Sequence, residues 1–251
     1  MASTYFEPPG PRVLAHRGFA VDAPENTLLA FENAVAIGVQ YIETDVHVSH
    51  DGIAVVAHDP SLARVAGRDI AVAQLAMAEL RRVDLGRGQG FCSLEEALDA
   101  FPETRFNIDV KVERAVEPVV SAVMRTRAES RVLLTSFSER RRLRLASLVP
   151  GVATSAGSAG VIRARVAAFT GPEARLVRAL RGAGALQIPE RSGRVRLVTA
   201  RFVEAVQRAG SEVHVWTVNE APDMARLLDL GIDGLVTDRA DVAFEVISSR
   251  T

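Results

Sequence analysis

The sequence predicts an α/β protein folded as a (β/α)₈ barrel in a single domain, residues 1–251. Its length suits this class, because barrels of about this size commonly form one domain. Short apolar runs alternate with longer segments of helical period along the chain. No linker, low-complexity tract or fixed-period repeat divides it. Counting elements leaves a doubly wound open sheet as the alternative.

Eight runs of strand character follow one another along the chain. They span residues 12–16, 41–48, 105–111, 131–136, 151–155, 185–189, 213–218 and 234–237. Segments between them carry apolar residues at helical spacing, at 26–38, 94–101, 115–127, 202–210 and 222–231. Several of these segments end in glycine, a common helix stop signal. Such alternation predicts parallel strands joined by helical crossovers.

A ninth strand-like run, residues 53–59, follows the second strand too closely for the crossover that a parallel neighbour needs. Asp51-Gly52 is a typical two-residue hairpin loop, so this run is predicted to form a β-hairpin arm on strand two. In that register Asp45 faces His58. A slip of one residue would break this pairing.

The composition excludes several classes of function. The net charge of −1 favours neither nucleic acid nor an anionic membrane as partner. The one cysteine, Cys92, rules out an intrachain disulfide and argues against a cysteine-based zinc site. No apolar run has the length of a membrane helix, and the first residues do not resemble a secretory signal. A cytoplasmic protein without stable membrane insertion is therefore expected, and its oligomeric state is left open.

Ionisable side chains stand in the predicted strands where apolar residues are usual. Glu43 and Asp45 lie two apart on strand two and therefore on one face, to which the hairpin register adds His58. Asp109 and Lys111 are likewise two apart on strand three. Functional groups of a barrel gather at the C-terminal ends of its strands, so we expect these side chains to meet there.

Strand one ends in His16 and Arg17, just before a glycine, and they complete the candidate site. The three carboxylates of the site are hard oxygen ligands that suit Ca²⁺ or Mg²⁺. Arginine and lysine suit a phosphate, and two histidines suit proton transfer near neutral pH. The residues therefore predict metal-assisted cleavage of a phosphate ester.

Eight short motifs, in this order, resemble those of the glycerophosphodiester phosphodiesterase family. They are HRG at 16–18, PENT at 24–27, ETD at 43–45, DG at 51–52, HD at 58–59, NIDVK at 107–111, WTVN at 216–219 and GIDGLVTD at 231–238. Together they span nearly the whole chain. Any one of them alone would be weak, whereas the combination is specific.

The resemblance implies a TIM barrel that hydrolyses glycerophosphodiesters to glycerol 3-phosphate and an alcohol, with one divalent cation as cofactor. It implies that a cyclic phosphate forms by attack of the glycerol hydroxyl and is then opened by water. The resemblance also implies a role for each of eight residues. It implies that His16 and His58 are the acid–base pair, that Glu43, Asp45 and Asp109 bind the metal, that Arg17 and Lys111 hold the phosphate, and that Trp216 lines the pocket.

The chain departs from the family pattern at two places. Many relatives have glutamate where this chain has Asp109, whose side chain is one methylene shorter. Relatives often carry a sizeable insertion between strands two and three, whereas residues 60–92 form a short one here, expected to lie over the active site. These departures leave the metal and the preferred alcohol open.

Two other functions are weighed on the same fold. A lysophospholipase D would need an apolar surface near the barrel mouth, and the sequence shows none. An inactive barrel that only binds phosphodiesters is disfavoured, because both histidines and all three carboxylates are present. His47, His50 and His214 are expected in solvent or turns, and Asp238 is expected to cap the last helix.

Overall fold

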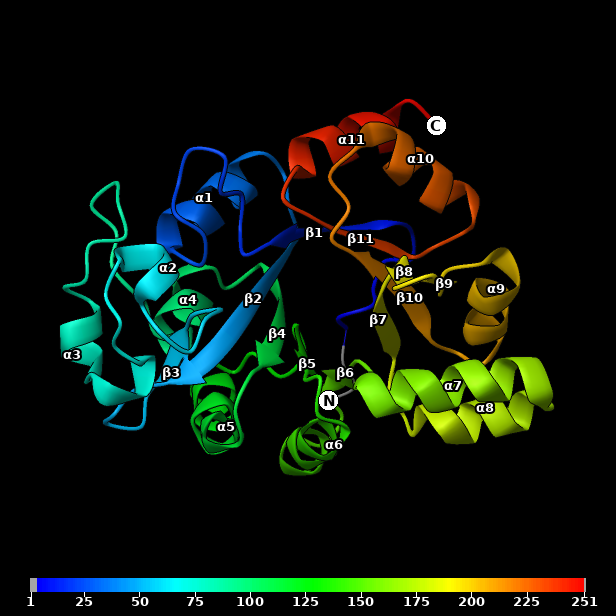
Figure 1. The fold of residues 1–251 in the computed structure, drawn as a ribbon, viewed down its shortest axis with the longest axis horizontal. Helices are drawn as coiled ribbons and strands as arrows, with labels where there is room; N and C mark the ends of the chain where they lie inside the picture. Colours follow the sequence, from blue (N-terminus) through cyan, green and yellow to red (C-terminus); the bar gives the residue numbers. More distant parts are fainter. Residues whose placement is uncertain (1–3, 251) are drawn as a thin grey trace.

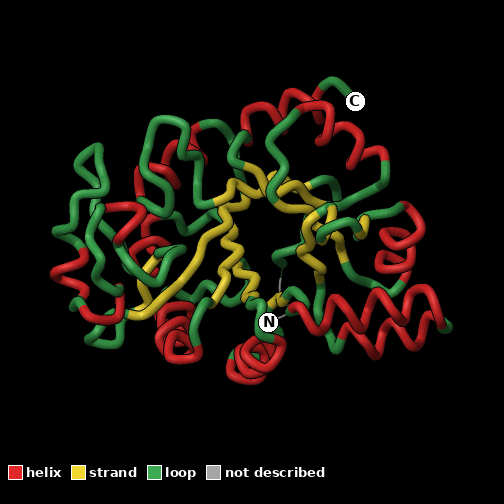
Figure 2. Tube along the Cα trace, in the orientation of Figure 1, coloured by secondary structure: helices red, strands yellow, loops and turns green. Residues whose placement is uncertain are grey.

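The computed structural model of the chain describes residues 4–250 and shows a closed barrel of eight parallel strands (Figures 1 and 2). The barrel strands are β1 (Arg12–His16), β2 (Tyr41–Val48), β4 (Arg105–Val110), β5 (Val132–Thr135), β6 (Ala153–Thr154), β7 (Ala185–Pro189), β10 (Glu212–Trp216) and β11 (Gly234–Thr237). Their order around the ring is β6-β5-β4-β2-β1-β11-β10-β7. A single bridge between Ser155 and Ala185 joins β6 to β7 and closes the ring. The predicted barrel is confirmed.

Helices surround the strands on the outside of the barrel (Figure 1). They are α1 (Leu28–Ala36), α4 (Leu94–Ala100), α5 (Val116–Arg125), α6 (Glu139–Leu148), α7 (Ser158–Thr170), α8 (Glu173–Leu180), α9 (Ala200–Arg208), α10 (Ala221–Asp229) and α11 (Ala240–Ser248). Several begin at a hydroxyl cap, as where the Thr27 side chain accepts from the Ala30 amide. Ser93 and Glu96 form a reciprocal capping box on α4.

The main core lies between the sheet and this ring of helices. Phe31 of α1, Phe106 of β4 and Phe202 of α9 are fully buried in it. Phe31 meets Phe106 edge to face, with ring centroids 5.7 Å apart. This packing fixes the strands that carry the polar residues. Among residues 4–250 no helix has the length and apolar character to cross a membrane. The single-domain prediction for residues 1–251 and the cytoplasmic location stay predictions.

The hairpin arm is confirmed, but its predicted register is wrong by one residue. Strand β3 (Ala54–Val56) pairs antiparallel with β2 so that Val46 faces Val56. The Ala57 amide consequently bonds the Asp45 carbonyl, and His58 follows beyond the paired residues. The loop holds three residues instead of two, because the Ser49 amide bonds the Ile53 carbonyl and Gly52 takes the left-handed conformation, φ 81°.

Residues 60–92 form α2 (Ala63–Ala66), η1 (Val72–Gln74) and α3 (Met77–Leu80) outside the arm (Figure 1). They have a small core of their own, in which Leu62, Met77 and Leu80 pack against Val55 of β3. Short elements also follow β4 and β7, namely η2 (Glu113–Ala115), β8 (Arg191–Ser192) and β9 (Val195–Arg196). The sequence did not predict β8, β9 or the antiparallel pair α7 and α8.

A buried ion pair closes the N-terminal end of the barrel. Arg12 is 3% exposed and donates two hydrogen bonds to Glu212, at 2.8 and 2.6 Å. Its third nitrogen donates to the Tyr41 hydroxyl at 2.6 Å. His214 is fully buried beside them, with its Nε2 2.9 Å from Glu212. The expectation that His214 faces solvent is therefore wrong, because its side chain points into the barrel.

Candidate active site

Strand register brings the polar residues together at the C-terminal end of the barrel. His16 of β1 pairs with Glu43 of β2, and Glu43 pairs in turn with Asn107 of β4. Two residues further along, Asp45 pairs with Asp109. Directly paired residues of neighbouring strands project to the same side. The barrel therefore places these side chains in two adjacent rows of its interior, as the sequence predicted.

The three carboxylates are crowded and largely out of solvent. Glu43, Asp45 and Asp109 are 8%, 2% and 6% exposed. Burial, and then the nearby Asp45, raise the pKa of Glu43 to about 8. Burial also raises the pKa of Asp109, although Lys111 opposes this. A site at which carboxylates are pushed toward their neutral forms is one that favours added positive charge.

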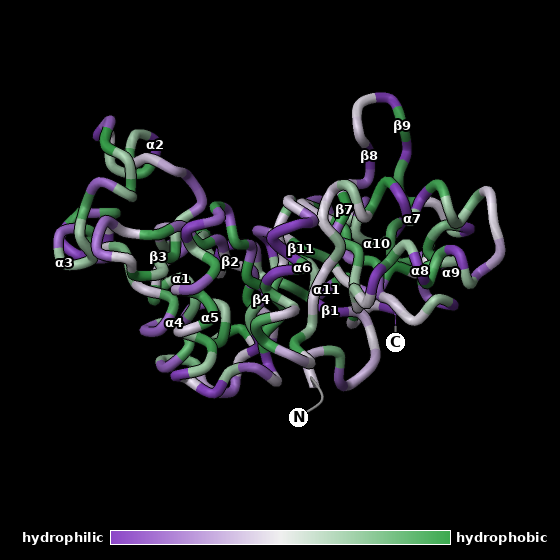
Figure 3. Tube along the Cα trace, turned by 90° about the horizontal axis from the view of Figure 1, so that it is seen from below, coloured by the Kyte–Doolittle hydropathy of each residue, from purple (hydrophilic) through white to green (hydrophobic). Residues whose placement is uncertain are grey.

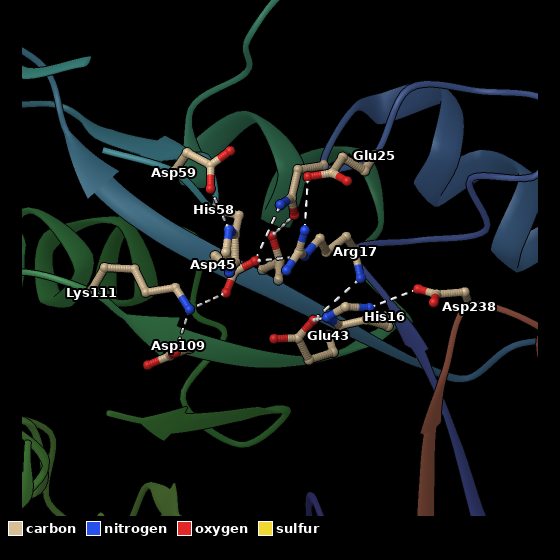
Figure 4. Close-up of polar contacts among 12 residues, drawn as sticks. His16, Arg17, Glu25, Glu43, Asp45, His58, Asp59, Asp109, Lys111 and Asp238 are labelled. Carbon is tan, nitrogen blue, oxygen red and sulfur yellow. Dashed lines mark hydrogen bonds and ion pairs between the residues drawn. The ribbon is translucent and has the colours of Figure 1, made fainter. Parts of the chain in front are cut away.

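Lys111 and Arg17 supply the positive charge that the structure contains. The Lys111 ammonium lies 2.6 Å from Asp45 and 2.7 Å from Asp109, so that it bridges the two carboxylates (Figure 4). Arg17 places its Nε 3.3 Å from Asp45, without the alignment of a hydrogen bond, and donates to Glu25 at 3.0 Å. Both cations thus lie against the carboxylate that is central to the site.

The backbone around Arg17 is held in an uncommon conformation. Arg17 has φ 58°, and its amide reaches both the carbonyl and, at 3.2 Å, the carboxylate of Glu43. Gly18 follows at φ 85°, and a Cβ there would lie 2.8 Å from the backbone of Ala30. The glycine of the HRG motif therefore lets α1 approach strand β1 closely.

His16 is oriented by a residue from the other end of the chain. Its Nδ1 lies 2.7 Å from Asp238, which follows β11, and its Nε2 lies 4.0 Å from Glu43 (Figure 4). The hydrogen bond from His16 lowers the pKa of Asp238, so Asp238 is ionised and only accepts; the shared proton therefore sits on Nδ1. Burial lowers the pKa of His16, but the bond to Asp238 and the charge of Glu43 outweigh it.

Asp238 is the functional neighbour that sequence reasoning missed. It does not cap α11, whose N-cap is Arg239. Asn219 donates to Asp238 at 2.7 Å and accepts from its amide at 2.9 Å, which holds the carboxylate toward His16. The signal was present in the motifs, because WTVN ends in Asn219 and GIDGLVTD ends in Asp238.

His58 reaches the site even though the hairpin register differs from the prediction. It lies just beyond β3, lines the same cavity as His16 and is bonded through Nδ1 to Asp59 at 2.7 Å. His47 is 7% exposed, and its Nε2 lies 3.1 Å from the His58 carbonyl. The expectation that His47 faces solvent is wrong, whereas His50 is an exposed turn residue as expected.

The PENT motif supports the site through three separate contacts. Asn26 is buried and donates to Asp45 at 3.3 Å, while the Thr44 hydroxyl donates to Asn26 at 2.7 Å. Thr27 caps α1. Glu25 bridges Arg17 and Arg64, so it fixes the arginine rather than the helix.

The carboxylate set fits a hard divalent cation in its chemistry. The Asp109 Oδ1 and Asn107 Oδ1 oxygens are buried without a hydrogen-bond partner, and oxygen atoms of this kind are what such a cation binds. The Lys111 ammonium already stands between Asp45 and Asp109. Within the described part of the chain, no group of three or more His, Cys, Asp or Glu side chains has the spacing of a ready metal site.

One cavity of about 450 Å³ connects all eight predicted site residues. Its charged half comes from β1, β2, β4 and the end of the arm. Its other half is mainly apolar and includes Trp216, Phe137, Val161, Ile162 and Ile188. Trp216 packs edge to face on Phe137, with centroids 6.0 Å apart. The lining residues lie outside the 60–92 insertion, which instead lines a smaller adjoining cavity that shares His58.

The chain is similar to known proteins along nearly its whole length. A model of the glycerophosphoryl diester phosphodiesterase family matches residues 16–242. The chain belongs to this family. The resemblance and the enzyme class predicted from the sequence are therefore confirmed. A protein of Mycobacterium tuberculosis described as probable glycerophosphodiester phosphodiesterase 2 is 42% identical over 239 residues, which are 94% of this chain and 90% of that one.

Solved structures of the family agree with the fold. A glycerophosphodiester phosphodiesterase from Agrobacterium tumefaciens is 25% identical, with a TM-score of 0.78 over 95% of this chain and 99% of that one. A phosphodiesterase from Oleispira antarctica, solved with the product sn-glycerol-3-phosphate, is 24% identical, with a TM-score of 0.79 over 95% of this chain and 97% of that one. The second likeness bears on the fold alone.

Proposed function

We propose that the protein hydrolyses glycerophosphodiesters to glycerol 3-phosphate and an alcohol, using one divalent cation, Ca²⁺ or Mg²⁺. The observation that carries the proposal is that one cavity collects two histidines, three buried carboxylates, an arginine and a lysine. Glu43, Asp45 and Asp109 would hold the cation, which when bound supplies positive charge to a phosphate oxygen. Arg17 and Lys111 would hold the phosphate itself.

His16 and His58 are proposed as the acid–base pair. Each has its Nδ1 bonded to an aspartate whose pKa is lowered, Asp238 for His16 and Asp59 for His58. A proton on Nδ1 leaves Nε2 of the neutral ring as the group that exchanges protons. One histidine would take the proton of the attacking glycerol hydroxyl, and the other would protonate the departing alcohol. The resulting cyclic phosphate would then be opened by water.

The test is release of glycerol 3-phosphate from glycerophosphocholine. Wild-type protein is compared with His16→Ala and with EDTA-treated protein to which Ca²⁺ or Mg²⁺ is returned. We expect the substitution and the chelator each to abolish turnover, and one metal to restore it to the treated wild type. Full activity after exhaustive chelation would contradict the metal requirement, and full activity of His16→Ala would contradict the role of this histidine.

Lysophospholipids are a second candidate substrate class, favoured by the apolar half of the cavity. Ile162 lines that half and is 65% exposed, so the apolar lining continues out of the mouth. The sequence alone had shown no such surface. Comparing lysophosphatidylcholine with glycerophosphocholine as substrates for the same preparation separates the two classes. A higher kcat/KM for the lipid would make it the preferred class, and no turnover of it would remove this candidate.

A further inference from the structure

Helix α7 carries an exposed apolar stripe, of which only Phe169 is partly covered, by Phe202 and Arg201 of α9. Ile162, Val166 and Phe169 lie four and three residues apart, hence on one face of the helix, and they are 65%, 52% and 39% exposed. The opposite face, with Ala164 and Ala167, is buried in the core. A surface helix normally turns its apolar face inward, so an outward stripe of three large residues calls for a reason.

The stripe is continuous with the active-site cavity. Ile162, at its inner end, lines the apolar half of that cavity. The β8–β9 hairpin stands beside α7, because Arg165 of the helix donates to the carbonyls of Arg196 and Leu197 at 2.8 and 2.7 Å. The hairpin adds Val195, which is 55% exposed.

These elements lie at the mouth of the barrel. Figure 1, in which the strands form a ring, shows α7 running outward from that ring across the view. Figure 3 shows the β8–β9 hairpin projecting from the body of the molecule on the same side as α2. The hairpin follows β7 directly, so it leaves from the C-terminal end of the barrel, where the catalytic histidines also lie. Because Ile162 also lines the cavity, a flat surface that met the inner end of the stripe would lie at the cavity mouth.

The two segments that form this surface carry side-chain charge of one sign, although Glu190 and Glu204 flank the second segment. Residues 158–170 and 191–203 contain six arginines and no aspartate or glutamate, in a chain whose net charge is −1. Arg163 pairs with Glu139, and Arg196 lies 3.8 Å from Glu190. Arg191, the first residue of β8, and Arg194, in the turn of the hairpin, are exposed and form no ion pair within residues 4–250. Exposed apolar side chains bordered by free arginines complement an anionic lipid surface.

We propose that α7 and the β8–β9 hairpin dock the protein on the surface of a lipid aggregate with anionic head groups, with the cavity mouth turned toward the lipid. The docking is peripheral, since the stripe is one helix face that rests on the surface and does not span it. Docking would bring the active site to phosphodiesters carried in the lipid. That benefit rests on the proposed phosphodiesterase activity, whereas the docking itself does not.

The test is co-sedimentation of the full chain with vesicles of phosphatidylcholine mixed with phosphatidylserine, and with vesicles of phosphatidylcholine alone. We expect binding to the mixed vesicles that weakens as salt is raised. Arg191→Gln/Arg194→Gln should lower the partition coefficient about 25-fold, because each arginine near such a surface contributes about fivefold. Val166→Asp should lower it at least about tenfold, because it removes apolar contact and adds repulsion.

Matched control variants are available at the other end of the barrel. Met124 on α5 is 50% exposed, and Arg178 is an exposed arginine in the last turn of α8. Both helices end where the chain returns to the N-terminal ends of the strands. Met124→Asp and Arg178→Gln should leave vesicle binding unchanged. The proposal would be overturned if wild type bound neither vesicle. It would also be overturned if the control variants weakened binding as much as Arg191→Gln/Arg194→Gln and Val166→Asp do.

Two further readouts keep the outcomes distinct. A chain that sediments as a dimer, becomes monomeric on Val166→Asp and ignores vesicles would show that a second copy covers the stripe, which also overturns the proposal. Glycerophosphocholine turnover is measured on the same variants and should be unchanged, because none of the substituted residues lines the cavity. Absence of that turnover in wild type would count against the proposed function and leave the vesicle result standing.

Discussion

Both ends of this barrel hold ionisable side chains largely out of solvent, yet leave them in opposite states. At the N-terminal end, Arg12 donates two hydrogen bonds to Glu212. Burial alone would raise the pKa of Glu212, but the hydrogen bonds from Arg12 and His214 outweigh it and lower that pKa. At the C-terminal end, the carboxylates of Glu43, Asp45 and Asp109 outnumber the nearby cations, and the pKa of Glu43 rises to about 8. The charges at the N-terminal end are paired with one another, whereas the C-terminal end has excess negative charge that a cation would neutralise.

Structural and functional ionisable groups in a barrel can be distinguished by whether their charges and hydrogen bonds are satisfied. A buried ion pair whose hydrogen bonds are all made contributes to structure, and removing one member costs stability. Crowded carboxylates with unpartnered oxygens, such as Asp109 Oδ1, cost stability and persist where they bind or react. Substitutions at the two ends should therefore separate activity from stability.

The largest effect is expected at the mouth, from His58→Ala. If His58 is an acid–base group, as proposed, its loss should lower kcat/KM for glycerophosphocholine by about 10²- to 10⁴-fold, while the thermal midpoint changes little because the side chain is 34% exposed. His50→Ala, in the turn of the same hairpin, is the matched control and should retain activity within about twofold. Equal losses in the two variants would refute the assignment.

The second largest effect is expected at the N-terminal end of the barrel, where a substitution should lower stability rather than activity. Arg12→Ala should lower the free energy of unfolding by about 3–5 kcal/mol, because it leaves Glu212 without its main partner in a buried place. Urea unfolding measures this loss. Arg178→Ala, which removes an exposed arginine, should cost less than about 0.5 kcal/mol. Equal costs for the two substitutions would contradict the stabilising role assigned to the Arg12–Glu212 ion pair.

A third prediction concerns pH and has opposite signs at the two ends. Glu43 has a folded pKa of about 8 against 4.5 normally, so the stability it contributes is present below pH 4.5 and is lost as pH rises toward 8. In metal-free protein, Glu43→Gln should flatten this decline, which amounts to about 2 kcal/mol or more since one pKa unit is worth about 1.36 kcal/mol.

Glu212→Gln is the counterpart at the closed end. The pKa of Glu212 is lowered below 4.5, so its contribution is present above that pH and is lost as pH falls through the folded value. This variant should be less stable than wild type at neutral pH and lose less on acidification. Chemical unfolding at a series of pH values gives the free energy of unfolding of both variants. Identical pH dependence in the two variants would contradict opposite pKa shifts for Glu43 and Glu212.

The smallest expected effect is that of Asp238→Asn, which keeps the shape of the residue but removes its charge. We expect a loss of about tenfold in kcat/KM, because His16 loses the partner that fixes its ring. The pKa read from the pH–rate profile should also fall, since Asp238 helps to raise that of His16. Asp241→Asn, three residues further on, is the control and should change neither quantity.

Much of the fold and of the site could be predicted, because strand patterns have short periods. Alternation put Glu43 and Asp45 on one face, and the parallel register then set them beside Asp109. The hairpin register could not be fixed the same way. Asp51-Gly52 is compatible with a two- or a three-residue loop. The Ser49 hydroxyl accepts a hydrogen bond from the Ile53 amide, which favours the three-residue loop.

Contacts between distant parts of the chain were beyond the sequence pattern. Asp238 is 222 residues from His16, so its nearest signal was the start of the following helix. His47 and His214 stand on strands, where alternation shows only which face a residue shares, and the burial of that face follows from closure of the barrel. Helix α7 was missed because both its buried and its exposed face carry apolar residues, so its sequence lacks the one-sided pattern of a core helix.

The closure between β6 and β7 has a mechanical consequence. Strands β2 and β4 share six paired residues, whereas β6 and β7 meet at one bridge, with hydrogen bonds only from Gly184 to Thr154 and from Ala156 to Ala185. This line of contact is held by fewer hydrogen bonds than the β2–β4 pair and is expected to open more easily than that pair. That line runs on the apolar side of the cavity, beside α7, and away from β1, β2 and β4. Opening there would enlarge the apolar side of the cavity and leave the charged side, on β1, β2 and β4, in place.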